Sequence, residues 1–108
     1  MPNNRKNYFS DFTEELIKYL ENNITNMFKS KKDIDVAYAI IELLKRRDEI
    51  ENFNKKALYV LIREMTNIET SYITKVVNVL KKEYKWLAEQ FETKGIIEGK
   101  NNKNKFFN

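Results

Sequence analysis

Six polar side chains share one side of a helix that is predicted over residues 70–93. They are Ser71, Tyr72, Thr74, Lys75, Asn78 and Lys82. The apolar residues between them recur at the three- and four-residue spacing of a single stripe, so the six fall on the outer side. Hydroxyl, amide and ammonium groups can bond to base edges and phosphate oxygens. The pattern predicts a nucleic-acid-binding surface, although the solvent face of an ordinary amphipathic helix has the same composition.

Each of these side chains has a distinct use at a DNA surface. Asn78 can pair with adenine through two hydrogen bonds, and Lys75 can reach guanine or a phosphate. Ser71 and Thr74 are small enough for a close approach, and Tyr72 can contact a thymine methyl group or a phosphate. Four further lysines are expected on backbone phosphates and would make binding salt-dependent. These are Lys55, Lys56, Lys81 and Lys85.

The residue types that most enzymes use are scarce. The chain has no His and no Cys, which removes the commonest general base, the thiol nucleophile and most zinc sites. Its two glycines, Gly95 and Gly99, form no phosphate-binding loop. The carboxylates Asp48, Glu49 and Glu51 follow a basic run, as on a solvated surface. We therefore predict no catalytic role, no cofactor and no metal.

The strongest local pattern is a helix, a tight turn and a second helix over residues 54–82. The two apolar stripes are Leu58, Leu61, Ile62 and Met65, then Ile73, Val76, Val77 and Leu80. Asn67 is the expected pivot, because Asn tolerates the left-handed backbone better than any residue but Gly. Thr70 is expected to cap the second helix, and Ile68 is expected to enter the crease between the two helices.

The segment from Tyr59 to Asn78 resembles the helix-turn-helix of small phage and bacterial DNA-binding proteins. Asn67 stands where the family usually has its turn glycine. The apolar positions of the motif are held by Ile68, Ile73 and Val76, and the sequence departs from the motif at Arg63, Thr66 and Glu69. The resemblance implies double-stranded DNA binding by a transcription regulator of phage or bacterial type. A homodimer is also expected, because two-fold pairing multiplies the base contacts of one short helix.

Two more helices are predicted before this pair. A capping box that begins at Asp11 predicts a helix from there to about Lys29. Ser30 or Asp33 can cap the next helix, which is expected over residues 34–48. Asn54 can cap the third helix, which is expected over about 55–66. The fold class predicted is all-α, with four helices, a helix-turn-helix at about 55–82 and no clear β wing.

The last helix is predicted to be long, because its apolar stripe continues through Tyr84, Leu87 and Phe91. Its overhanging part, with Trp86, would pack on the first helix or form a dimer contact, and packing within the chain is favoured slightly. The predicted organisation is a flexible N-terminus (1–9), one helical domain (10–98) and a basic disordered tail (99–108). Near its end the tail has Phe106 and Phe107, which could dock in a partner groove, but an unstructured end is favoured over docking.

Charge is unevenly distributed along the 108 residues. Residues 33–53 hold six acidic and three basic residues, whereas residues 54–94 hold eight basic and five acidic ones. The basic block suits a face turned to phosphates. The acidic block, Trp86 and the tail support an alternative, a small adaptor that binds RNA polymerase or a replication protein. A cytoplasmic location and no membrane contact are expected, because cysteine, a signal segment and a run of about 20 apolar residues are lacking.

Overall fold

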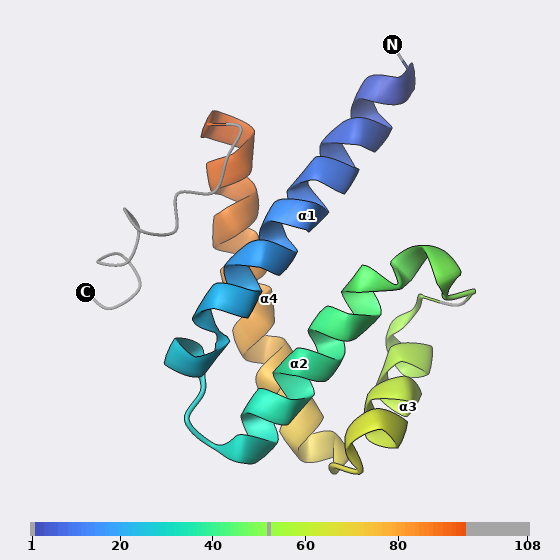
Figure 1. Cartoon of the computed structure of the whole chain (residues 1–108), viewed down its shortest axis with the longest axis vertical. Helices are drawn as coiled ribbons and strands as arrows, with labels where there is room; N and C mark the ends of the chain where they lie inside the picture. Colours follow the sequence, from blue (N-terminus) through green and yellow to red (C-terminus); the bar gives the residue numbers. More distant parts are fainter. Residues whose placement is uncertain (1, 52, 95–108) are drawn as a thin grey trace.

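Four α-helices form almost all of the computed structural model (Figure 1). It describes residues 2–51 and 53–94, with side chains over 11–51 and 53–93. The helices are α1 (Pro2–Met27), α2 (Lys31–Lys45), α3 (Lys55–Thr66) and α4 (Thr70–Lys94), and a 3-10 turn, η1 (Arg47–Glu49), follows α2. These described ranges contain no strand, so the predicted all-α class is confirmed. The predicted tail lies outside the described residues.

Helix α2 lies at the centre and contacts each of the other three helices. In Figure 1, α4 crosses behind α1 and α2, and α3 stands beside α2 on the side away from α1. The molecule is flat, with extents of 40 × 38 × 17 Å. A thickness of that order matches two helix layers, since packed helix axes lie about 8–10 Å apart. Within the described residues, no helix is both long and apolar enough to cross a membrane.

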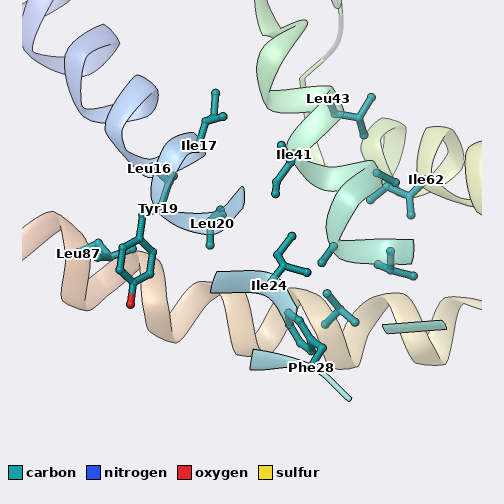
Figure 2. Packing of buried hydrophobic residues seen from close by; sticks show 14 of the residues in the cluster. Leu16, Ile17, Tyr19, Leu20, Ile24, Phe28, Ile41, Leu43, Ile62 and Leu87 are labelled. Carbon is teal, nitrogen blue, oxygen red and sulfur yellow. The ribbon is translucent and has the colours of Figure 1, made fainter. Parts of the chain in front are cut away.

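The core lies where α1, α2 and α4 meet (Figure 2). The largest fully buried side chains come from these three helices: Ile24, Val36, Ile73, Val76 and Leu87. Helix α3 adds only Ile62 to the buried set, while its Met65 is 47% exposed. The prediction that Met65 belongs to the buried stripe is therefore wrong, because α3 packs along a narrower line than its apolar spacing implies.

Two side-chain caps fix the starts of α2 and α3, as the sequence predicted. The Ser30 hydroxyl accepts a hydrogen bond from the Asp33 amide at 3.1 Å, and the Asn54 side chain accepts one from the Ala57 amide at 2.9 Å. Each cap satisfies a backbone donor that the helix itself leaves unpaired. Helix α3 begins and ends where the sequence predicted. Helix α2 begins three residues earlier than predicted and gives way to η1 after Lys45.

Helix α1 is longer than predicted, because it begins at Pro2 rather than at Asp11. Residues 2–9, which were expected to be a flexible N-terminus, are therefore helical. Polarity alone does not end a helix, and no Gly or second Pro interrupts this stretch. Pro2 itself stands at the first helical position, where its missing amide hydrogen has no intrahelical partner to lose.

The second half of α4 packs on α1, as the sequence favoured. The Phe12 ring lies 5.4 Å from the ring of Tyr84 and 5.4 Å from the ring of Phe91, centroid to centroid. Phe12, Leu87 and Phe91 are all buried. The long extension of α4 is thus part of the core and holds the rest of the helix in place.

Candidate nucleic-acid interface

The turn between α3 and α4 has the backbone that its sequence predicted. Asn67 adopts the left-handed conformation, with φ 57° and ψ 34°, and its amide donates to the Arg63 carbonyl at 2.7 Å. Ile68 follows and is buried in the core cluster. Asn67 as the pivot is confirmed, and Ile68 is buried, as a residue expected in the crease would be. This geometry sets the start of α4 close to the end of α3.

The threonines of this turn act differently from the prediction. Thr70 is the first residue of α4, and the Glu69 carbonyl accepts the first helical bond, from the Ile73 amide at 3.2 Å. Glu69 therefore holds the capping position, and the prediction for Thr70 is wrong. Thr66, at the end of α3, donates to the Ile62 carbonyl at 2.7 Å and accepts from the Ile68 amide at 3.2 Å. Its hydroxyl ties the turn to α3.

One arc of α4 is exposed along most of its length, and we call it the outer face of α4. It consists of Ser71, Thr74, Asn78, Lys81, Lys82 and Lys85, which are all exposed. At about 100° per residue, these six lie within an arc of about 100°. Glu83, the one carboxylate between Thr70 and Ala88 on this helix, is half-buried on the opposite side. Over residues 71–85 the outer face thus carries three lysines and no acidic residue, and the exposed Glu89 and Glu92 continue the same arc toward the end of α4.

In the described part of the chain, no ion pair offsets the positive charge of the outer face over residues 71–85. Among the described residues, the ion pairs involve Lys18, Lys31, Lys45, Arg46 and Lys75. Lys81, Lys82 and Lys85 have no carboxylate within ion-pair distance in that part of the chain. Fully solvated ammonium groups on one face leave a local positive potential that attracts anions.

Two of the predicted contact residues turn toward α2 instead. Tyr72 is half-buried, and the ammonium of Lys32 lies 4.6 Å from the centre of its ring. The ammonium of Lys75 lies 2.9 Å from a carboxylate oxygen of Asp33. Tyr72 therefore does not share the outer face, and Lys75 lies at its edge with its charge paired. Helical periodicity alone places both side chains on the outer side of α4. The packing of α2 against this flank turns them toward α2 instead.

Asp33, which the sequence identified only as a possible cap, forms an ion pair between α2 and α4. Its side chain is 6% exposed, and that of its partner Lys75 is 60% exposed. The second carboxylate oxygen of Asp33 is buried with no hydrogen-bond partner among the described residues. A buried carboxylate depends on its partner charge, so this pair fixes the first turns of α2 and α4 to each other.

The other flank of α4 is held by α3. The Tyr59 hydroxyl donates to the Thr74 hydroxyl at 3.3 Å, and the Lys55 ammonium lies 5.8 Å from the centre of the Tyr59 ring. Lys55 and Lys56 are both exposed at the start of α3. The structure therefore brings Lys55 beside the outer face of α4. Lys56 is exposed in the same first turn of α3.

A buried acid lies on the inner side of α4, opposite the lysines. One carboxylate oxygen of Glu83 is buried without a partner in the described part, and burial raises the pKa of Glu83 to about 7. Tyr19 of α1 is buried nearby, and Figure 2 shows its hydroxyl directed at α4. Burial, and then the charge of Glu83, raise the pKa of Tyr19 above its ordinary value. The described side chains contain no group of three or more acidic residues placed to hold a metal ion.

These features define a small, all-α protein whose long last helix is apolar on one side and carries three lysines on the exposed side over residues 71–85. Comparison of the chain with protein-family models, with curated proteins and with solved structures finds no match in any of the three. Any functional assignment therefore depends on the site itself.

Proposed function

We propose that this protein binds double-stranded DNA through the outer face of α4, as a small cytoplasmic transcription regulator of phage or bacterial type. The observation that carries the proposal is the set of lysines on that face that have no ion-pair partner among the described residues. Lys81, Lys82 and Lys85 stand on one exposed arc with no carboxylate among them. Phosphates are the natural partners of such an arc, because neutralising them releases bound counterions.

The order of side chains along the outer face also supports DNA. Ser71, Thr74 and Asn78 occupy its first part, where short polar groups allow a close approach to base edges. The lysines follow in the second part. From Ser71 to Lys85 the helix rises by about 21 Å, at about 1.5 Å per residue. The major groove is about 12 Å wide, so a helix whose first turns enter it would carry its lysines to the flanking phosphates.

The direct test is fluorescence anisotropy with a random-sequence duplex over a salt series. Wild-type protein should bind in the micromolar range at low salt and lose affinity steeply as salt rises. The triple variant Lys81→Gln, Lys82→Gln, Lys85→Gln should reduce the slope of log affinity against log salt by up to about 2.7, or about 0.9 per lost contact. Lys18→Gln is the matched control, since Lys18 is exposed on α1. Absence of wild-type binding at low salt would refute the proposal.

We further propose that this face recognises a preferred DNA sequence. Asn78 is exposed between Thr74 and Lys82 and is the residue best suited to pair with adenine. Once a preferred site has been selected from random duplexes, Asn78→Ala should lower the preference for it by about 1–3 kcal/mol. Affinity for random DNA should change little, because that binding rests on phosphates. We also propose that a homodimer binds such a site, which sedimentation with a palindromic duplex would test.

A second candidate function is binding to a protein partner such as RNA polymerase or a replication protein. The observation that favours it is a groove of about 460 Å³ between α1, α2 and α3, bordered by Tyr38 (44% exposed) and Met65 (47% exposed). Tyr38 lies about 140° around α2 from Asp33, so the groove faces away from α4. Tyr38→Ser with Met65→Ser should abolish binding to purified polymerase on this view, and unchanged binding would refute it.

A further inference from the structure

The outer face of α4 is bounded by a different helix on each side. Tyr72 and Thr74 lie about 160° apart around α4, at about 100° per residue. Thr74 accepts a hydrogen bond from Tyr59 of α3, whereas the Tyr72 ring lies under the ammonium of Lys32 from α2. The exposed arc between these two flanks therefore runs between the first turn of α2 and the first turns of α3.

Both boundaries carry exposed lysines. On the α3 side these are Lys55 and Lys56, which the sequence already indicated. On the α2 side it is Lys32, which is exposed and has no ion-pair partner among the described side chains. Its ammonium lies 4.6 Å from the centre of the Tyr72 ring, a distance at which a cation is attracted to the ring face. Tyr72 thus directs Lys32 toward α4.

The neighbouring lysines of this edge are already engaged. Lys31 pairs with Asp35 at 3.0 Å, one turn along α2. Lys75 pairs with Asp33 at 2.9 Å, and its charge is offset by that carboxylate. Lys32 is therefore the described residue of this edge whose charge is available to an anion. The Asp33–Lys75 pair serves to hold the two helices together, which keeps Lys32 beside the outer face.

We propose that the first turn of α2 is a second phosphate-contacting edge of this surface, with Lys32 as the contact and Tyr72 as its positioning residue. The inference rests on the proposed DNA-binding function. A helix that lies in the major groove has one phosphate backbone on each side, because the groove is bounded by both strands. Lys55 and Lys56 face the backbone on the α3 side, and Lys32 faces the other.

The test measures the salt slope of wild-type and variant chains with one random duplex of about two helical turns, roughly 20 base pairs. Lys32→Gln should reduce the slope by about 0.9, as expected for one lost phosphate contact. Lys18→Gln, which removes the same charge from α1, should leave the slope unchanged. Circular dichroism melting of each variant checks that the fold is retained.

The positioning role of Tyr72 needs a pair of variants that leave every charge in place. Tyr72→Leu removes the aromatic ring that holds the Lys32 ammonium beside α4. The salt slope should therefore fall by less than the value of about 0.9 expected for one lost phosphate contact. Tyr72→Phe keeps the ring and should retain the wild-type slope. A purely structural role for Tyr72 would lower the melting temperature of the leucine variant without changing the salt slope.

The outcomes separate this inference from the function on which it rests. A reduced slope for Lys32→Gln, with Lys18→Gln unchanged, supports the α2 edge. If Lys32→Gln binds as wild type while the triple variant of Lys81, Lys82 and Lys85 loses slope, the α2 edge is refuted and DNA binding stands. If wild-type protein does not bind the duplex at low salt, both proposals are refuted together.

Discussion

The ion pair between Asp33 and Lys75 changes how the effect of a Lys75 substitution must be interpreted. A lysine at the edge of a DNA-facing surface would ordinarily be tested by replacing it with alanine. Here that change would also leave a carboxylate that is 6% exposed without its partner charge. Loss of one member of a buried pair is costly, because the remaining charge is neither solvated nor compensated. Weaker DNA binding by such a variant would not by itself identify Lys75 as a contact.

We expect Lys75→Ala to reduce the free energy of unfolding by about 1–3 kcal/mol, less than for a fully buried pair because Lys75 is 60% exposed. Lys82→Ala, on the outer face of the same helix, should change it by less than about 0.5 kcal/mol. Urea denaturation at neutral pH measures both. Equal effects of the two substitutions would show that the ion pair contributes little to stability.

Glu83 makes stability depend on pH in a direction that can be stated in advance. Its pKa is raised from 4.5 to about 7 by burial, so the folded state holds a proton that the unfolded state releases. The contribution of Glu83 is therefore most favourable below about pH 4.5 and is lost as pH rises through about 7. Tyr19, whose pKa is raised, stays neutral throughout this interval.

Glu83→Gln should accordingly stabilise the protein at pH 8 by about 1–2 kcal/mol, a figure reduced for the partial exposure of the side chain. At pH 5 the difference between variant and wild type should be much smaller, since Glu83 is then protonated in the folded state and both side chains are neutral there. Urea denaturation at the two pH values gives the comparison, and titration of other groups cancels in the difference. A difference of the same size at both pH values would contradict the assignment.

At the scale of the helices, the features that sequence predicted are those governed by neighbouring residues. Ser30 and Asn54 cap their helices through hydroxyl and amide groups three residues from the amides they bind. Asn67 supplies the left-handed turn, and α3 ends where the sequence placed its end. These depend on local backbone preferences, which a sequence carries directly.

The features that sequence did not predict depend on which helix lies beside which. Helical periodicity assigns Tyr72 and Lys75 to the polar side of α4. However, α2 packs there, and its Lys32 and Asp33 contact Tyr72 and Lys75. Met65 fits the apolar stripe of α3 by spacing, yet no helix covers it and it is 47% exposed. Of the ten predicted contact residues, only Tyr72 and Lys75 are turned toward α2 by this packing. The binding roles of the others stay predictions.

The turn between α3 and α4 allows a test at this scale. Asn67→Ala should destabilise the protein by about 1 kcal/mol, because φ 57° brings a Cβ close to the following carbonyl oxygen and Ala has no side-chain polar group to offset it. Asn67→Gly should have little effect, since Gly adopts this conformation without steric cost. Thermal unfolding compares the two variants. A more stable alanine variant would mean that the turn does not keep its left-handed residue.

The whole molecule is a flat plate whose two sides differ in chemistry. The outer face of α4 presents unpaired lysines, while the groove on the far side of α2 presents Tyr38 and Met65 beside carboxylates that are already paired. With two such sides, the proposed DNA and the proposed protein partner would not compete for the same surface. That requires the long α4 to stay fixed to α1, because α1 anchors the second half of the helix that carries the lysines.

Phe12 tests that requirement, since it joins α1 to both Tyr84 and Phe91 at 5.4 Å and is 4% exposed. Phe12→Ala should reduce stability by about 3–5 kcal/mol, the usual cost of emptying a buried aromatic site. A loss of that size is a large fraction of the roughly 5–15 kcal/mol that stabilises a single domain. Differential scanning calorimetry should therefore show a melting temperature lower by more than about 10 °C.

Phe53→Ala is the matched control, because Phe53 is the same residue type but is 42% exposed in the connection before α3. It should lower the melting temperature by only a few degrees, about 1 kcal/mol or less. The wild-type melting temperature should also be independent of protein concentration, because the contact between α1 and α4 lies within one chain. A wild-type melting temperature that rises with protein concentration, together with loss of that rise in Phe12→Ala, would place the aromatic contact between two copies of the chain. The outer face of α4 would then be assembled only in the dimer.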